Sequence, residues 1–160
     1  GMMGVGKTTL GKIVAKKQNM EFIDTDLVIE EKNLMTVSKI FEQKGQMFFR
    51  KEEEEVVLKC LEKKNCVIAL GGGSFINKTL RENILNDSIS VWLDMDTKTL
   101  NARTQWNPKR PLLKKENNQK KLNELYAARK DIYKLANYKI VCDGLSKNSI
   151  VKKIMQLYEK

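Results

Sequence analysis

Short apolar runs alternate along this chain with longer segments in which apolar residues recur every three or four positions. The apolar runs predict four strands, within EFIDTD (21–26), CVIAL (66–70), ISVWLD (89–94) and YKIVC (138–142). The periodic segments predict helices at 8–18, 36–43, 46–63, 79–86, 96–105, 119–136 and after Ser146, with Thr36 and Ser146 as N-caps. Strands that alternate with helices indicate an α/β fold whose parallel sheet is covered by helices.

The length of 160 residues fits one domain, 1–160. No stretch approaches the ~18 apolar residues of a membrane span, and no leader resembles a secretion signal, so we expect a cytoplasmic protein with no membrane partner. The cysteines, Cys60, Cys66 and Cys142, lack metal-site spacing and are interpreted as reduced core thiols. Histidine is absent, so any chemistry must use carboxylates, lysine, arginine, backbone amides and hard cations.

The net charge of +10 raises the possibility of nucleic-acid binding. The lysines are scattered and interleaved with glutamates, and no RNA-binding aromatic motif accompanies them, so we favour a lysine-rich surface around a site for an anionic substrate. Only five of the 30 basic residues are arginines, whose planar fork suits bidentate recognition. They are Arg50, Arg81, Arg103, Arg110 and Arg129.

The first eight residues, GMMGVGKT, satisfy the phosphate-loop pattern G-x-x-x-x-G-K-[ST]. Glycines in such a loop let backbone amides face the phosphate oxygens of a nucleotide at the positive end of the following helix. Lys7 adds a point charge, and the Thr8 hydroxyl is a candidate ligand of Mg²⁺. The alternative is a chance glycine-rich turn, which the helix directly behind the loop argues against. The predicted ATP-binding residues of the loop are Gly1, Gly4, Val5, Gly6, Lys7, Thr8 and Thr9.

A phosphate loop normally follows a buried strand in the middle of the sheet. No such strand stands ahead of Gly1. We therefore expect roughly ten further residues upstream of Gly1, without which the core would be incomplete.

Three features predict the site of the phosphate acceptor. DTD places Asp24 and Asp26 two apart at the end of a strand, so both side chains are expected to lean the same way. Arg50 starts a helix with Glu53 one turn on, close enough to orient it. Three glycines, 71–73, end a strand where backbone can approach a ligand closely. The alternatives are a turn with a helix cap for DTD, a surface ion pair for Arg50 and a tight turn for the glycines.

With these motifs, the chain resembles the shikimate kinase family from the phosphate loop onward. The resemblance is carried by GVGKTT, FIDTD, IFEQKGQMFFRKEE, LGGG, RPLL and AARKDIY in this order and spacing. It implies a P-loop three-layer fold related to nucleoside monophosphate kinases, with a central parallel sheet of strand order 2-3-1-4-5 whose first strand is missing here. It also implies transfer of the γ-phosphate of ATP to the 3-hydroxyl of shikimate, in aromatic amino-acid biosynthesis.

The resemblance implies a role for each motif residue. Asp26 would bind the ring hydroxyls and act as candidate base, and Asp24 would join Thr8 at the Mg²⁺ site. Arg50 and Arg129 would hold the substrate carboxylate, with backbone of Gly71, Gly72 and Gly73 lining the site. Arg103 would stack on adenine, and catalysis would rest on Lys7, Asp26 and Arg110.

Several expectations refine this site. The segment 36–63 is the predicted substrate-binding segment. Asp26 beside Arg50 should stay ionised and may serve more to orient the hydroxyl than to remove a proton early. Phe41 and Phe49 are expected in the core, Phe75 could touch substrate, and Glu53 should hold Arg50. The rest of the EEEE run should be a solvated face paired with lysines, and Arg81 ordinary helix surface.

The loop WNPKRPLLKKENN, 106–118, is interpreted as a lid that excludes water during phosphoryl transfer. The alternative is a disordered surface loop. If Arg110 lies on a lid, replacing it with alanine should lower kcat strongly and change shikimate affinity little.

Other functions fit less well. The pair Arg50 and Arg129, together with LGGG, argues against a gluconate kinase or a nucleoside monophosphate kinase, and no Asn-Lys-x-Asp motif supports a GTPase. An inert nucleotide-binding module or a basic nucleic-acid-associated protein would not need Lys7, Asp26 and Arg110 together. We expect a monomer that binds ATP, Mg²⁺ and shikimate and no nucleic acid; contacts to adenine within 143–148 stay unassigned.

Overall fold

The computed structural model describes residues 1–104 and 118–158. Eight helices, one short 3₁₀ helix and four strands follow one another in this part of the chain. They are α1 (Lys7–Gln18), β1 (Glu21–Asp24), α2 (Thr25–Asn33), α3 (Val37–Gln43), α4 (Gly45–Leu61), β2 (Cys66–Ala69), η1 (Ser74–Ile76), α5 (Lys78–Asp87), β3 (Val91–Asp94), α6 (Thr97–Thr104), α7 (Asn118–Tyr133), β4 (Tyr138–Val141) and α8 (Lys147–Tyr158). The predicted strands and most predicted helices are confirmed, with boundaries shifted by a few residues.

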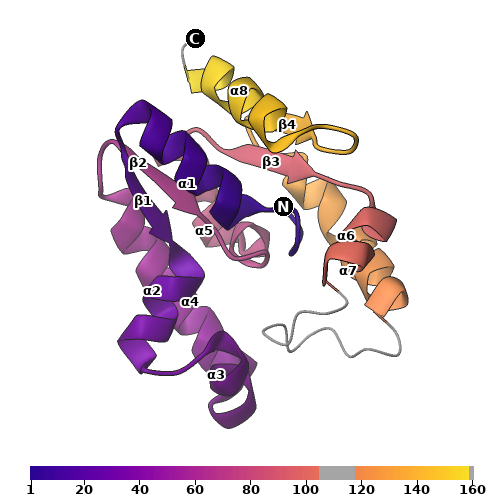
Figure 1. Cartoon of the computed structure of the whole chain (residues 1–160). Coiled ribbons are helices and arrows are strands. Elements are labelled where there is room, and N and C mark those ends of the chain that lie inside the picture. Colours follow the sequence, from indigo (N-terminus) through magenta and orange to yellow (C-terminus); the bar gives the residue numbers. More distant parts are fainter. Residues whose placement is uncertain (105–117, 159–160) are drawn as a thin grey trace.

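The strands form two parallel pairs (Figure 1). β1 pairs with β2 in a register that sets Glu21 opposite Cys66 and Asp24 opposite Ala69. β3 pairs with β4 and sets Val91 opposite Tyr138. The expected order, 2-3-1-4-5, counts the missing first strand as strand 1, so β1 to β4 correspond to its strands 2 to 5. The observed pairs β1–β2 and β3–β4 are then its pairs 2-3 and 4-5, which confirms the α/β fold.

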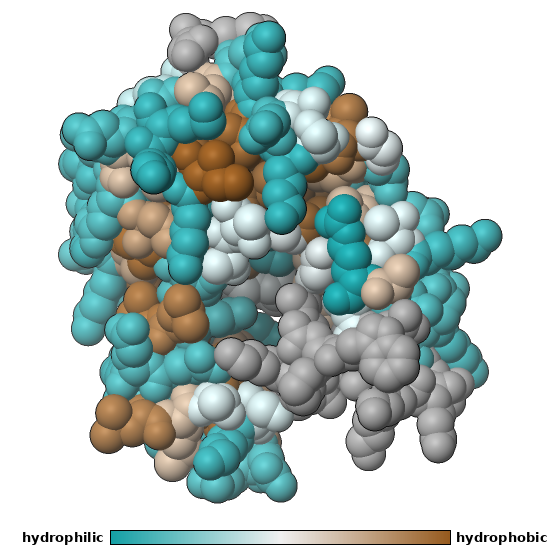
Figure 2. Space-filling view, in the orientation of Figure 1, coloured by the Kyte–Doolittle hydropathy of each residue, from teal (hydrophilic) through white to brown (hydrophobic). Residues whose placement is uncertain are grey.

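An apolar cavity of about 440 Å³ lies between the two strand pairs. Its lining includes Val67 and Ile68 of β2, Trp92 and Leu93 of β3, and apolar side chains of α1 and α8. Figure 2 shows apolar surface gathered where α1 and α8 approach each other, on a molecule that is otherwise largely hydrophilic on this face. The carbonyl oxygen of Leu93 also lies so close to Gly1 that a Cβ atom there would be 2.5 Å from it. The start of the phosphate loop is therefore packed against β3.

A second, smaller core lies between the β1–β2 pair and the helices α2, α3 and α4. It is built from Ile23, Ile29, Ile40, Phe49, Val56 and Cys60. The rings of Phe41 and Phe49 contact each other at a centroid distance of 4.7 Å, so the expectation that they belong to the core is confirmed. This cluster fixes α4 against α2, and these helices carry Arg50 and Asp26.

One prediction of local structure is wrong. The strand β1 ends at Asp24, and Thr25 already begins α2, a helix that the sequence pattern did not predict. The side chain of Asp24 caps this helix by accepting hydrogen bonds from the backbone N–H groups of Asp26 and Leu27. DTD therefore contains the helix cap of the alternative interpretation, and this cap is compatible with a further role of the two carboxylates.

No helix in the described ranges, 1–104 and 118–158, is long and apolar enough to cross a membrane. The predicted lid, 106–118, and its residue Arg110 lie outside the described residues except for position 118.

Candidate functional site

The phosphate loop is shaped by two glycines in the left-handed region. Gly4 has φ 83° and Gly6, the residue before α1, has φ 105°, conformations that L-residues with a side chain rarely adopt. The Lys7 ammonium donates hydrogen bonds to the carbonyl oxygens of Gly1 and Met2 at 2.9 and 3.0 Å. The lysine thus lies over the loop, in the place where a nucleotide phosphate would meet both it and the start of α1.

Thr8 and Asp24 meet although they are 16 residues apart. The Thr8 hydroxyl donates to Oδ2 of Asp24 at 2.6 Å. Hydroxyl and carboxylate oxygens are the hard donors that Mg²⁺ prefers, and this cation usually takes one or two protein ligands besides phosphate and water. No cluster of three or more acidic, cysteine or histidine side chains suited to a metal occurs among the described residues.

Asp26 lies in the first turn of α2, next to this pair. The pKa of Asp26 is raised to about 6, mainly by burial and next by the neighbouring carboxylate of Asp24. The Lys7 ammonium acts in the opposite direction. At pH 7 about nine in ten such groups are still ionised. The expectation of an ionised Asp26 is therefore consistent with this pKa, but its stated cause is wrong, because the Arg50 guanidinium is engaged by Glu53 instead.

The turn Gly71–Gly73 after β2 is the point at which the predicted site residues converge. A Cβ atom on Gly71 would lie 2.7 Å from Oδ1 of Asp26, and one on Gly72 would lie 3.6 Å from the Arg129 guanidinium. A Cβ atom on Gly73 would collide with the guanidinium of Arg50. The Gly72 position also faces the phosphate loop, at 3.5 Å from the carbonyl oxygen of Gly1. Side chains of three helices and the phosphate loop thus approach this turn, and Gly71 and Gly73 leave no room for a Cβ atom, whereas at Gly72 a Cβ atom would make ordinary contacts.

Arg50 is oriented from within its own helix. Its guanidinium forms an ion pair with Oε2 of Glu53, three residues on in α4, and Glu53 is only 1% exposed. The other oxygen, Oε1, accepts a 2.7 Å hydrogen bond from the Ser74 hydroxyl. Glu53 therefore holds Arg50 as expected and also ties α4 to the end of the glycine turn.

Arg129 reaches the turn from the opposite side, on α7. Its guanidinium donates to the carbonyl oxygen of Gly72 at 3.3 Å, and the hydroxyl of Tyr133, one helical turn later, donates to the same oxygen at 2.5 Å. Burial raises the pKa of the Tyr133 hydroxyl, so this group stays a protonated donor.

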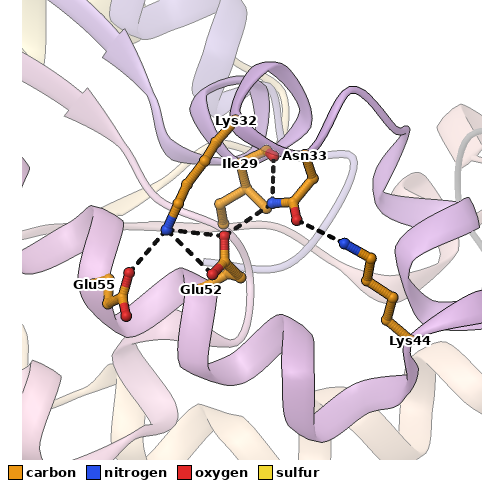
Figure 3. A network of polar contacts seen from close by, with 6 residues as sticks. All are labelled: Ile29, Lys32, Asn33, Lys44, Glu52 and Glu55. Carbon is orange, nitrogen blue, oxygen red and sulfur yellow. Dashed lines mark hydrogen bonds and ion pairs between the residues drawn. The ribbon is translucent and has the colours of Figure 1, made fainter.

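A polar network behind the site joins α2 to α4 (Figure 3). The Lys32 ammonium contacts both Glu52 and Glu55, and the Asn33 amide donates to Glu52 at 2.9 Å and to the carbonyl oxygen of Ile29. The Asn33 oxygen accepts from Lys44 just before α4. For the rest of the EEEE run, the expected pairing with lysine is confirmed at Glu52, which contacts Lys32. The expected solvation is wrong for Glu52, which is 9% exposed, because partners from α2 compensate its burial.

Three further residues that the sequence analysis singled out lie in other parts of the structure than the ion pair and the network described above. Arg103 lies in the last turn of α6. Its positive charge acts to lower the pKa of the Cys142 thiol, the residue after β4, although burial raises that pKa overall. Arg103 thus lies on the side of the 143–148 loop, to which the sequence analysis assigned no site. Phe75 is buried in the main core. Arg81 is not ordinary surface, because its guanidinium donates to the carbonyl oxygens of Phe75 and Ile76 at the end of η1.

Three buried hydroxyl groups at the site were missed by the sequence analysis. Thr25 and Ser74 are fully buried, Tyr133 is 1% exposed, and each hydroxyl is hydrogen-bonded at or beside the glycine turn. A usable signal existed for Tyr133, which follows Arg129 by four residues and so shares its helix face. Thr25 and Ser74 carried no comparable signal.

Known proteins are similar to this chain over nearly its whole length. The shikimate kinase family model matches residues 3–159. A shikimate kinase of Sulfurihydrogenibium sp. is 38% identical over 155 residues, which are 97% of this chain and 92% of the relative. A shikimate kinase of Methylococcus capsulatus is also 38% identical, over 100% of this chain and 90% of the relative.

Solved structures are similar over nearly the same extent. The shikimate kinase from Acinetobacter baumannii in complex with shikimate has a TM-score of 0.94 and 35% identity, covering 99% of this chain and 89% of that chain. The shikimate kinase from Aquifex aeolicus has a TM-score of 0.86 and 30% identity, covering 99% and 92%.

Proposed function

This chain belongs to the shikimate kinase family, and from that premise we propose how its residues transfer the γ-phosphate of ATP to the 3-hydroxyl of shikimate. The observation that carries the assignment is the convergence at Gly71–Gly73, where Asp26, Arg50 and Arg129 approach the same backbone that faces the phosphate loop. A phosphate donor and a carboxylate-bearing acceptor would thus be held on the two sides of one turn.

On the donor side, the phosphates of ATP bind over the loop 1–8. Backbone N–H groups and the start of α1 supply partial positive charge, and Lys7 supplies a full one. Thr9 continues the helix behind the loop, and Arg103, in the last turn of α6, would stack on adenine. The phosphate oxygens would compete with the Gly1 and Met2 carbonyls for the Lys7 ammonium, a local change that requires no movement of α1.

Thr8 and Asp24 are the residues that would hold Mg²⁺. The cation, when bound, neutralises negative charge on the phosphates. Asp24 has two tasks in this arrangement, because it also caps α2 and thereby fixes the position of Asp26.

On the acceptor side, Arg50 and Arg129 bind the carboxylate of shikimate with planar, bidentate donors. Asp26 accepts a hydrogen bond from the hydroxyl that attacks. Its pKa of about 6 suits a group that is ionised at neutral pH and can receive the proton as the new bond to phosphorus forms. Most of the catalysis comes from positioning and charge neutralisation, as in other phosphoryl transfers.

The roles of Arg110 and of a lid at 106–118 remain part of the proposal and rest on the resemblance alone. A single domain 1–160, a cytoplasmic location and the lack of nucleic-acid binding are also part of the proposal and rest on the length and composition of the chain. The substrate-binding segment at 36–63 and a monomeric state rest on the resemblance.

A coupled ADP-release assay with ATP and Mg²⁺ tests the proposed function. Shikimate should support turnover, whereas gluconate and nucleoside monophosphates should not. A nucleoside monophosphate has no carboxylate for Arg50 and Arg129, and the open chain of gluconate does not hold its carboxylate and hydroxyls at one fixed distance as a ring does. Equal turnover with any of these acceptors, or ADP release that does not depend on the acceptor, would contradict the assignment.

A further inference from the structure

Thr25 lies between the two acidic residues of DTD and is fully buried. Its hydroxyl donates to the carbonyl oxygen of Ala69 at 3.3 Å and accepts from the backbone N–H of Gly71 at 3.2 Å. The first residue of α2 is thus attached to the backbone on both sides of Leu70, where β2 passes into the glycine turn. Since Asp26 is the next residue, Thr25 fixes the distance between the Asp26 carboxylate and this turn.

Burial alone does not explain why position 25 carries a hydroxyl group. Burying a hydroxyl costs free energy that its hydrogen bonds only roughly offset, and valine has nearly the same shape without that cost. What valine cannot supply is an acceptor for the Gly71 N–H. The backbone of Gly71 has little room to move, because it lies among Asp26, Glu53 and Ser74 with no space for a Cβ atom.

Tyr133 holds the next residue of the turn. It shares the carbonyl oxygen of Gly72 with Arg129, but the two donors differ in freedom. The Tyr133 ring is 1% exposed and packs against Trp92 at a centroid distance of 5.9 Å, so its hydroxyl is fixed by the core. A guanidinium that turns to the acceptor carboxylate weakens its own bond to Gly72, whereas Tyr133 keeps that carbonyl in place.

We infer that Thr25 and Tyr133 are positioning residues for the acceptor: their hydroxyls hold Gly71 and Gly72 in the arrangement that Asp26, Arg50 and Arg129 require. The inference rests on the proposed function for its kinetic consequence. It concerns no contact between these hydroxyls and the substrate, since both act through the backbone of the turn.

The first test compares Thr25→Val with Thr25→Ser. The valine variant loses the acceptor for Gly71 N–H and should raise the KM for shikimate about five- to tenfold, the size expected for one hydrogen bond. The KM for ATP and the thermal midpoint should change little. Serine restores the hydroxyl and should restore the KM. A purely structural role would instead give equal effects of valine and serine, or a lower midpoint with an unchanged shikimate KM, and either result overturns the inference.

The second test uses a matched pair of tyrosines on α7. Tyr133→Phe removes the donor to Gly72 and should raise the shikimate KM severalfold. Tyr126→Phe also removes a hydrogen-bonded hydroxyl from this helix, but its partner is Asp94, 3.0 Å away, and not the turn. The control should leave the shikimate KM unchanged. Similar KM changes in both variants would contradict a specific role of Tyr133.

A measurement without substrate separates this inference from the assignment of shikimate. The amide hydrogen of Gly71 can be followed by exchange in protein labelled with ¹⁵N-glycine. It should exchange at least several times faster in Thr25→Val than in the wild type or Thr25→Ser, while Gly11, inside α1, is unaffected. An unchanged rate at Gly71 overturns the inference even if shikimate is phosphorylated; faster exchange supports it even if the true acceptor is another carboxylate.

Discussion

Glu53 holds the guanidinium of Arg50 by an ion pair within one turn of α4, and the carboxylate of Glu53 is almost completely buried. Its second oxygen is occupied by Ser74, so neither oxygen is free to bind a ligand directly. The pair therefore forms one wall of the proposed acceptor site, in which Arg50 would provide the charge and Glu53 fixes its direction.

Replacing Glu53 with glutamine should lower kcat/KM for shikimate by at least tenfold. The amide keeps the volume and the hydrogen bond with Ser74, but it lacks the charge that orients Arg50. Steady-state kinetics with varied shikimate and varied ATP would check this, since the KM for ATP should not change. A loss that appears equally in both KM values would indicate general disruption of the fold and contradict the role.

Removing either arginine of the carboxylate site should weaken shikimate binding. Arg50→Ala and Arg129→Ala should each cost about 2–5 kcal/mol of binding free energy if the ion pair with substrate is buried. Calorimetric titration with shikimate measures this directly. Arg81→Ala is the matched control, because Arg81 binds only backbone carbonyls of η1 among its described contacts. Losses below about tenfold in both variants would count against the carboxylate assignment.

The pKa of Asp26 predicts how activity depends on pH. Burial raises this pKa to about 6, so kcat/KM for shikimate should fall as the pH drops through about 6 and Asp26 becomes protonated. Asp26→Asn should remove most of the activity at every pH. A wild-type profile that stays flat down to about pH 5 would show that ionised Asp26 is not required.

The same group predicts an opposite trend in stability. The pKa of Asp26 is higher in the folded protein than the ordinary value of 3.8, so the folded state binds the proton more tightly. The contribution to the free energy of unfolding is present below about pH 4 and is lost as the pH rises through about 6. In Asp26→Asn this part of the pH dependence should disappear, which denaturant unfolding between pH 4 and 7 would measure.

The cavity between β2 and β3 predicts a gain in stability from a designed extension. Four to six apolar β-forming residues fused ahead of Gly1 should enter the cavity of about 440 Å³, pair with the facing strand edges and raise the thermal midpoint by several degrees. A glycine–serine extension of equal length is the control; equal midpoints for both extensions would contradict the prediction.

The sequence predicts the parts of this site that depend on local spacing. The phosphate loop, the helix behind it and the Arg50–Glu53 pair all lie within single segments, and the four strands follow from short apolar runs. The continuation of DTD into a helix was missed, because the capping of α2 by Asp24 competes with the extended pattern of EFID. The residue types of this segment do not distinguish a continued strand from a capped helix.

Contacts between distant segments were not predictable in this way. Thr25 meets Gly71 across 46 residues, and Tyr133 meets Gly72 across 61. The burial of Glu52 likewise depends on Lys32 and Asn33, which α2 brings alongside α4. Such hydrogen bonds follow from how helices pack around the strands, and no periodicity within one segment encodes them.

The central claim is that donor phosphate and acceptor hydroxyl meet at the turn between Asp26 and the phosphate loop. Phosphorus–proton correlation NMR of the product formed from ATP and shikimate measures where the phosphate goes. The account predicts one phosphomonoester, coupled to the proton on carbon 3 of the ring, in amounts equal to the ADP released. Free inorganic phosphate in place of an ester, or an ester on another hydroxyl, would contradict it.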